Sequence, residues 1–145
     1  MTTSYSLAVI SDRLQALTRQ LDADPNLPGR MLVYDGTRPA SGQAPDSASF
    51  VLGQLIFPRP SLDSVTGTQL TLRNPATALV QVTGLATWAR LINGAGQYVA
   101  DMDVGVDGDV TADVIIRKAD GSPAVSTQLY AGGEFSVVLA RHVEA

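Results

Sequence analysis

The chain has 145 residues, which is the size of one ordinary domain and enough to bury a hydrophobic core without disulfides. Its net charge is −4, and its ten basic residues are dispersed, with Arg117 and Lys118 forming the longest basic run; this excludes the basic stripe that usually neutralises nucleic-acid phosphates. The absence of cysteine excludes a disulfide framework, a thiolate nucleophile and a zinc-finger pattern. Charged residues make up only 17% of the chain, which suggests a surface partly covered by protein partners.

The first residues, Met-Thr-Thr-Ser, do not form a basic region followed by an apolar one, and no signal cleavage site follows. The longest apolar runs are far shorter than the roughly 20 residues that span a bilayer. We therefore expect a soluble protein that is made in a cytoplasm and has no membrane segment.

One helix is predicted near the N-terminus, over about residues 5–22, with Ser4 or Ser6 as its cap and Asp22 to Pro25 as its end. Apolar residues recur at spacings of 3, 4, 3 and 4 and form one stripe: Leu7, Ile10, Leu14, Leu17 and Leu21. A helix of this length is marginal alone in water, so the stripe must be buried. Two alternatives remain open, packing on the chain's own domain and contact with a partner or a second copy.

After Pro28 the pattern changes to a period of two, which is typical of strands. We expect strands at 31–34, 50–57, 68–73, 110–117 and 134–143, and a polar loop at 35–49. Residues 79–83 either form a strand of their own or continue into the next strand through a bulge at Gly84.

A hairpin is expected from 85–92 and 97–106, because Asn93-Gly94-Ala95-Gly96 is a turn sequence of the hairpin type. Pairing Ile92 with Gln97 places Arg90 opposite Val99 and diagonal to Asp101, while Trp88 lies opposite Asp101. Tyr98 then falls on the other face from Trp88. The total of seven or eight short strands predicts a mainly β fold, a single antiparallel β-sandwich of jelly-roll-like form with one N-terminal helix. We expect one domain over 1–145, with the sandwich over about 30–144.

Few residues suggest chemistry. His142, the single histidine, lies at an outward position near the C-terminus without a partner motif for a catalytic triad. The acidic series Asp101, Asp103, Asp107, Asp109 and Asp113 offers the oxygen ligands that calcium prefers, but its spacing departs from the EF-hand pattern. We interpret the series as the polar face of a strand followed by a turn, and expect no enzyme activity, cofactor or metal.

Partner contacts are the better prediction. Trp88 and Arg90 share one face of the hairpin, and both residue types are enriched at binding hot spots. Trp88 is either a partner contact or ordinary core, and Arg38 and Pro39 belong either to a plain turn or to an interface loop. The candidate interface residues are Leu7, Ile10, Leu14, Leu17, Arg38, Pro39, Trp88 and Arg90.

Six stretches in order resemble a group of small structural proteins of tailed bacteriophages and prophages: 11–17, 31–42, 52–57, 83–91, 101–105 and 131–137. The clearest motifs are Tyr34-Asp-Gly-Thr-Arg-Pro-Ala after a strand and Thr83-Gly-Leu-Ala-Thr-Trp within another. The chain departs from this group over 62–79. The resemblance implies a virion protein, a minor capsid or decoration protein that contacts the major capsid protein or other virion subunits, and we expect it to form a homo-oligomer.

A tail, neck or baseplate component of the same virion is the alternative, and a carbohydrate-binding module facing the host is the second. An enzyme has the least support. We expect no nucleic-acid and no membrane partner.

Overall fold

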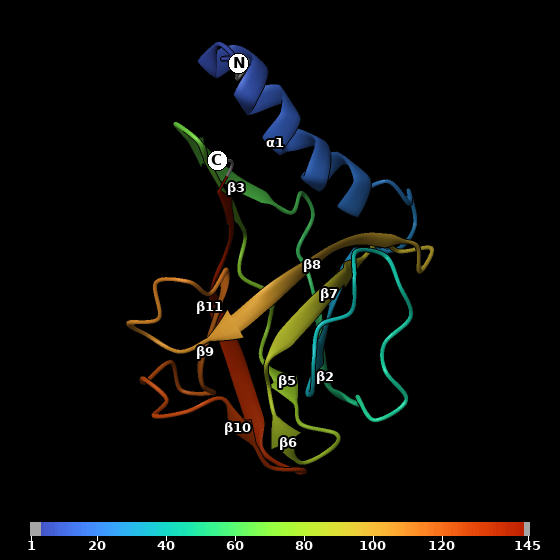
Figure 1. The fold of residues 1–145 in the computed structure, drawn as a ribbon, viewed down its shortest axis with the longest axis vertical. Helices are drawn as coiled ribbons and strands as arrows, with labels where there is room; N and C mark the ends of the chain where they lie inside the picture. Colours follow the sequence, from blue (N-terminus) through green and yellow to red (C-terminus); the bar gives the residue numbers. More distant parts are fainter. Residues whose placement is uncertain (1–3, 144–145) are drawn as a thin grey trace.

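The computed structural model describes residues 4–143, and within this range it contains one helix and eleven strands (Figure 1). The elements are α1 (Leu7–Leu21), β1 (Arg30–Tyr34), β2 (Val51–Ile56), β3 (Leu62–Thr66), β4 (Gln69–Leu72), β5 (Ala78–Leu79), β6 (Gly84–Leu85), β7 (Trp88–Ile92), β8 (Tyr98–Gly105), β9 (Val114–Lys118), β10 (Gln128–Leu129) and β11 (Glu134–Val143). No helix of the described range is long and apolar enough to cross a membrane.

Nine of the strands form one curled sheet in the order β2-β1-β7-β8-β9-β11-β4-β3, with β5 paired to β11. Strands β6 and β10 form a separate two-stranded pair. The curl brings residue 81 against the outer strand β2, where the Gln81 amide donates a hydrogen bond to the Leu52 carbonyl at 2.7 Å. The predicted fold class is confirmed: the protein is mainly β and β-sandwich-like, with one N-terminal helix.

One pairing departs from the antiparallel prediction. Strands β8 and β9 are parallel, although only eight residues separate them. The pairing joins just the end of β8 to the start of β9, Val104 with Val114 and Gly105 with Ile115. Because the overlap is so short, the chain needs only a return loop and no long crossover.

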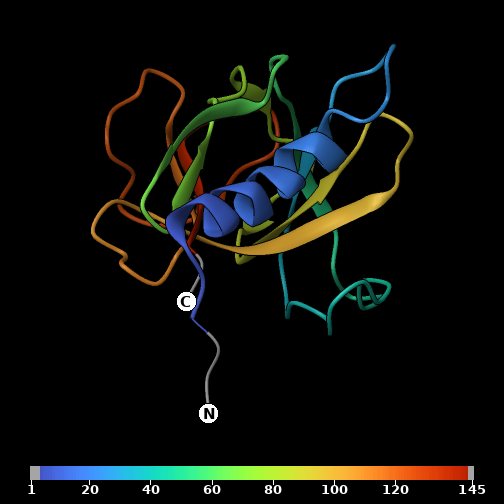
Figure 2. The same ribbon diagram turned by 90° about the horizontal axis from the view of Figure 1, so that it is seen from above.

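Helix α1 begins at the predicted cap, where the Ser6 hydroxyl accepts a hydrogen bond from the Val9 amide. The helix packs against β3, β4 and β8, and Figure 2 shows it lying across the curled sheet between the β3–β4 hairpin and β8. Most of the apolar stripe faces the core: Leu14 and Leu21 are fully buried, and Ile10 and Leu17 pack against the core from its margin. Leu7 is 66% exposed, so internal packing explains the stripe except at its first residue.

The hairpin of β7 and β8 forms with the predicted faces but in a different register. Ala89 pairs with Met102 and Leu91 with Ala100, a shift of two residues from the expected pairing over most of its length. Near the turn Ile92 pairs with Tyr98, so the β8 strand has an extra residue at this point. This irregularity moves Tyr98 to the face that carries Arg90.

Candidate interaction surface

Trp88 lies inside the domain. Its side chain is 1% exposed, its ring stacks on Tyr34 with centroids 4.3 Å apart, and its Nε1 donates to the Asp35 carbonyl at 3.1 Å. Of the two alternatives for Trp88, the structure supports internal packing, and direct contact of this side chain with a partner is excluded. The tryptophan instead fixes the start of the loop that follows β1.

Arg90 is also taken up by its own chain and is 9% exposed. Its guanidinium forms a two-point ion pair with Asp101, donates to the Gln43 carbonyl at 2.7 Å, and lies over the rings of Trp88 and Tyr98 at 5.4 and 5.0 Å. The hydrogen bond to Asp101 raises the pKa of Arg90 above its usual value, so this buried group stays charged. Arg90 therefore binds the 35–49 loop through the Gln43 carbonyl, and its charge is not available to a partner.

Arg38 and Pro39 remain near the surface of this loop. Arg38 forms a half-exposed ion pair with Asp103 at 3.3 Å, and Ser41 and Tyr98 share a hydrogen bond through their hydroxyls. Arg38, Pro39, Ser41 and Tyr98 line a polar hollow. The loop is ordered by contacts within the chain, so its length alone does not indicate a partner. The same burial of Trp88 weakens the carbohydrate-binding alternative, which relied on an exposed tryptophan.

The acidic series is divided among several separate contacts. Asp101 pairs with Arg90, Asp103 with Arg38 and Asp107 with Arg117, the last at 2.8 Å. Across residues 4–143, no three acidic or histidine side chains gather as metal ligands would. His142 is exposed near the end of β11, opposite Leu70 of β4.

A different surface emerges at the end of the molecule away from the helix. Two long uncharged stretches of the sequence, 74–89 with 16 residues and 121–133 with 13, meet there. The Ala86 amide donates to the Thr127 carbonyl at 3.0 Å, the Val80 amide donates to the Gly133 carbonyl at 2.8 Å, and the Ala131 amide donates to the Thr83 hydroxyl at 2.9 Å. The β6–β10 pair lies within this junction, at the lower end of Figure 1. We call the surface that these two stretches form the uncharged end.

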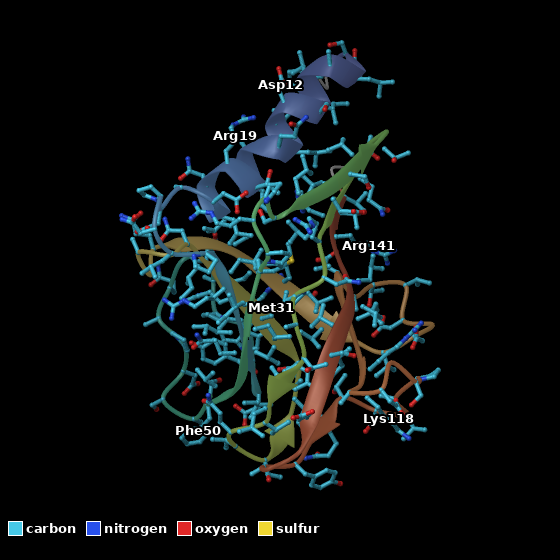
Figure 3. The ribbon with its side chains drawn as sticks, turned by 180° about the vertical axis from the view of Figure 1, so that it is seen from behind. Asp12, Arg19, Met31, Phe50, Lys118 and Arg141 are labelled. Carbon is cyan, nitrogen blue, oxygen red and sulfur yellow. The ribbon has the colours of Figure 1, made fainter. Side chains whose placement is uncertain are left out.

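Large apolar side chains are exposed on the uncharged end. Leu79, Val82 and Leu85 come from the first stretch, and Val125 and Tyr130 come from the second, with Tyr130 68% exposed. Phe50, also exposed, lies toward the same end in Figure 3, far from Asp12 of the helix. Scattered apolar residues on a surface need no explanation, but a group of them without charges among them is typical of protein–protein interfaces.

A small apolar hollow of about 150 Å³ opens in this region between β9, β11 and the second uncharged stretch. Val80, Ile116, Leu129 and Phe135 supply its apolar lining, and the charged residues Arg117, Lys118 and Glu134 also border it. A cavity of this size with an apolar lining is large enough for a benzene ring. The hollow can therefore receive one side chain of another protein.

Of the candidate residues named from the sequence, Trp88 alone belongs to one of the two uncharged stretches, and its side chain is buried. The signal was present in the sequence as two long runs without Asp, Glu, Lys, Arg or His, but only the fold shows that these runs lie side by side. Comparisons of the chain with family models, with curated proteins and with solved structures find no match.

Proposed function

We propose that this chain is a structural protein of a tailed-bacteriophage virion, a minor capsid or decoration protein that acts through protein–protein contacts and not through catalysis. The resemblance of six sequence stretches to such proteins motivates the virion assignment. The observation that carries the contact role is the uncharged end, where exposed apolar side chains gather on two stretches without a single charge.

A decoration protein stabilises a capsid shell through binding alone. A protein that binds the assembled capsid and not its separate subunits stabilises the assembly by mass action. Such binding requires surface that is apolar enough to be buried and rigid enough to lose little conformational entropy. The uncharged end meets both conditions, because backbone hydrogen bonds join its two stretches to each other and to β11.

The test is the protein content of purified particles from a host that expresses the tagged chain. We expect the chain in the particles at a copy number comparable to that of the major capsid protein. A copy number close to that of the portal would support the tail, neck or baseplate alternative. Absence of the chain from intact particles, or turnover of a substrate by the purified protein, would overturn the proposal.

A pair of variants connects the surface to the role. Tyr130→Asp places a charge on the uncharged end, and Val110→Asp places the same charge at an exposed loop position elsewhere. We expect Tyr130→Asp to reduce incorporation into particles and Val110→Asp to leave it unchanged. Equal incorporation of both variants would remove the uncharged end from the proposal.

A further inference from the structure

The uncharged end carries both a hollow and the side chains that protrude beside it. Ala124 and Ser126 line the hollow, while Val125 between them is 97% exposed and projects away from the chain's own core. Tyr130 stands at the rim of the same hollow and is also largely exposed. One surface thus offers an apolar cavity and apolar protrusions at close range.

This combination is self-complementary. In a twofold dimer both subunits use the same surface patch. Each contact therefore occurs twice, because the contact that one subunit makes with its partner is also made by the partner in return. Two copies related in this way can each place a protruding side chain in the hollow of the other. A head-to-tail contact would instead need the hollow and the protruding side chains on two different surfaces, and it would form a ring or a filament and not a closed dimer.

Electrostatics restrict the surface through which a second copy can bind. Each chain carries a net charge of −4, so two copies that approach through charged faces repel one another. Of the 29 residues in the two uncharged stretches, seven are buried, which leaves 22 that are at least partly exposed. This number lies within the 20–30 residues that one side of a standard interface takes.

We propose that the uncharged end binds a second copy of this chain in a twofold dimer, with Val125 and Tyr130 of each copy packed against the hollow formed by Val80, Ile116, Leu129 and Phe135 of the other. The inference rests on the proposed role of this surface in protein contact and names its partner.

The experiment is light scattering coupled to size exclusion, and sedimentation equilibrium, on the purified full chain from about 1 to 100 μM. We expect a dimer at the upper concentrations. Its dissociation constant should not rise between about 0.05 and 0.5 M salt, because the packed side chains are apolar and salt screens the repulsion between two chains of net charge −4. Tyr130→Asp should shift the dimer to monomer by at least tenfold in dissociation constant, and Val110→Asp should not. Circular dichroism and thermal unfolding must show both variants folded.

A cysteine probe locates the contact independently, because the chain has no cysteine of its own. With a short bismaleimide reagent, Val125→Cys should cross-link to dimers and Val110→Cys should not. A chain that stays monomeric at 100 μM, or cross-links equally at both positions, overturns the dimer. If the chain is monomeric and Tyr130→Asp still reduces incorporation into particles, the dimer is wrong and the contact role stands with a different virion protein.

Discussion

Arg90 and Asp101 lie directly opposite each other on β7 and β8, and their side chains form two hydrogen bonds, Nε to Oδ1 at 2.8 Å and Nη2 to Oδ2 at 3.1 Å. Both side chains are at most 10% exposed. Arg90 also donates to the Gln43 carbonyl, so the pair joins the central hairpin to the long loop that covers it. A buried two-point pair with satisfied hydrogen bonds fixes geometry more than an exposed one does.

Asp101→Ala tests this pair. Removal of the carboxylate leaves the Arg90 guanidinium buried without a counter-charge, which costs about 3–5 kcal/mol in similar pairs. We expect a loss of that size in the free energy of unfolding, measured by urea denaturation. Asp103→Ala on the same strand face is the matched control, because its half-exposed pair with Arg38 should contribute at most about 1 kcal/mol. Equal losses for the two variants would contradict the difference in burial.

The hairpin also shows what alternation in a sequence can predict. The period of two divided most side chains of β7 and β8 between the two faces correctly, because a slip of two residues keeps a side chain on its face. For the same reason it did not determine the register, which is shifted by two over most of the hairpin. It also did not show that both faces of β7 are buried. The extra residue beside Ile92 then placed Tyr98 over Arg90, and no feature of the alternation marked that irregularity.

Trp88→Ala should destabilise the whole domain. The ring is buried, stacks on Tyr34 and donates to the Asp35 carbonyl, so its removal opens a large cavity and frees the loop. We expect a loss of about 3–5 kcal/mol in thermal or urea unfolding. Trp88→Phe keeps most of the volume but leaves the carbonyl without its donor, and should cost about 1–3 kcal/mol. A folded Trp88→Ala protein of unchanged stability would refute this packing.

The helix stripe provides a second pair of variants. Leu14 is fully buried against the sheet, and Leu7, seven residues earlier on the same stripe, is mostly exposed. Leu14→Ala should cost about 2–5 kcal/mol of unfolding free energy, and Leu7→Ala should change it by less than about 0.5 kcal/mol. The measurement is chemical denaturation of the free chain. A large loss at Leu7 would mean that this end of the helix is covered in solution.

Prediction of the site was less successful than prediction of the fold, and the reason is physical. Trp and Arg are enriched at interfaces, but the same residues also make good internal anchors when an aromatic stack and an acid are near. Tyr34 lies beside Trp88 because β1 pairs with β7, and no local pattern indicates that pairing. Asp101 lies beside Arg90 through the predicted β7–β8 hairpin, but the sequence did not show that the pair is buried beneath the 35–49 loop. The uncharged end likewise depends on residues more than 40 positions apart, joined by hydrogen bonds such as that from the Ala86 amide to the Thr127 carbonyl.

Asp113 gives a prediction on pH. Asp113 is half-buried and immediately precedes β9, and its pKa is raised from the ordinary 3.8. Burial is the main cause and the nearby carboxylate of Asp103 is the next, while His142, Arg141 and Arg38 oppose the rise. The folded protein therefore holds this proton more tightly than the unfolded chain does.

The sign follows from that difference in proton binding. As pH rises from about 3.8 through the higher pKa of the folded state, ionisation of Asp113 lowers the stability of the fold, and the penalty persists at neutral pH. Asp113→Asn removes this penalty, so the variant should be more stable than the parent at pH 7 and equal to it near pH 3.

Asp107→Asn should have the opposite effect, because the hydrogen bond between Asp107 and Arg117 lowers the pKa of Asp107 and stabilises the fold at neutral pH. Thermal unfolding of the three proteins across pH 3–7 checks both signs, and a less stable Asp113→Asn protein at pH 7 would show that the Asp113 carboxylate is held by favourable contacts that outweigh its burial.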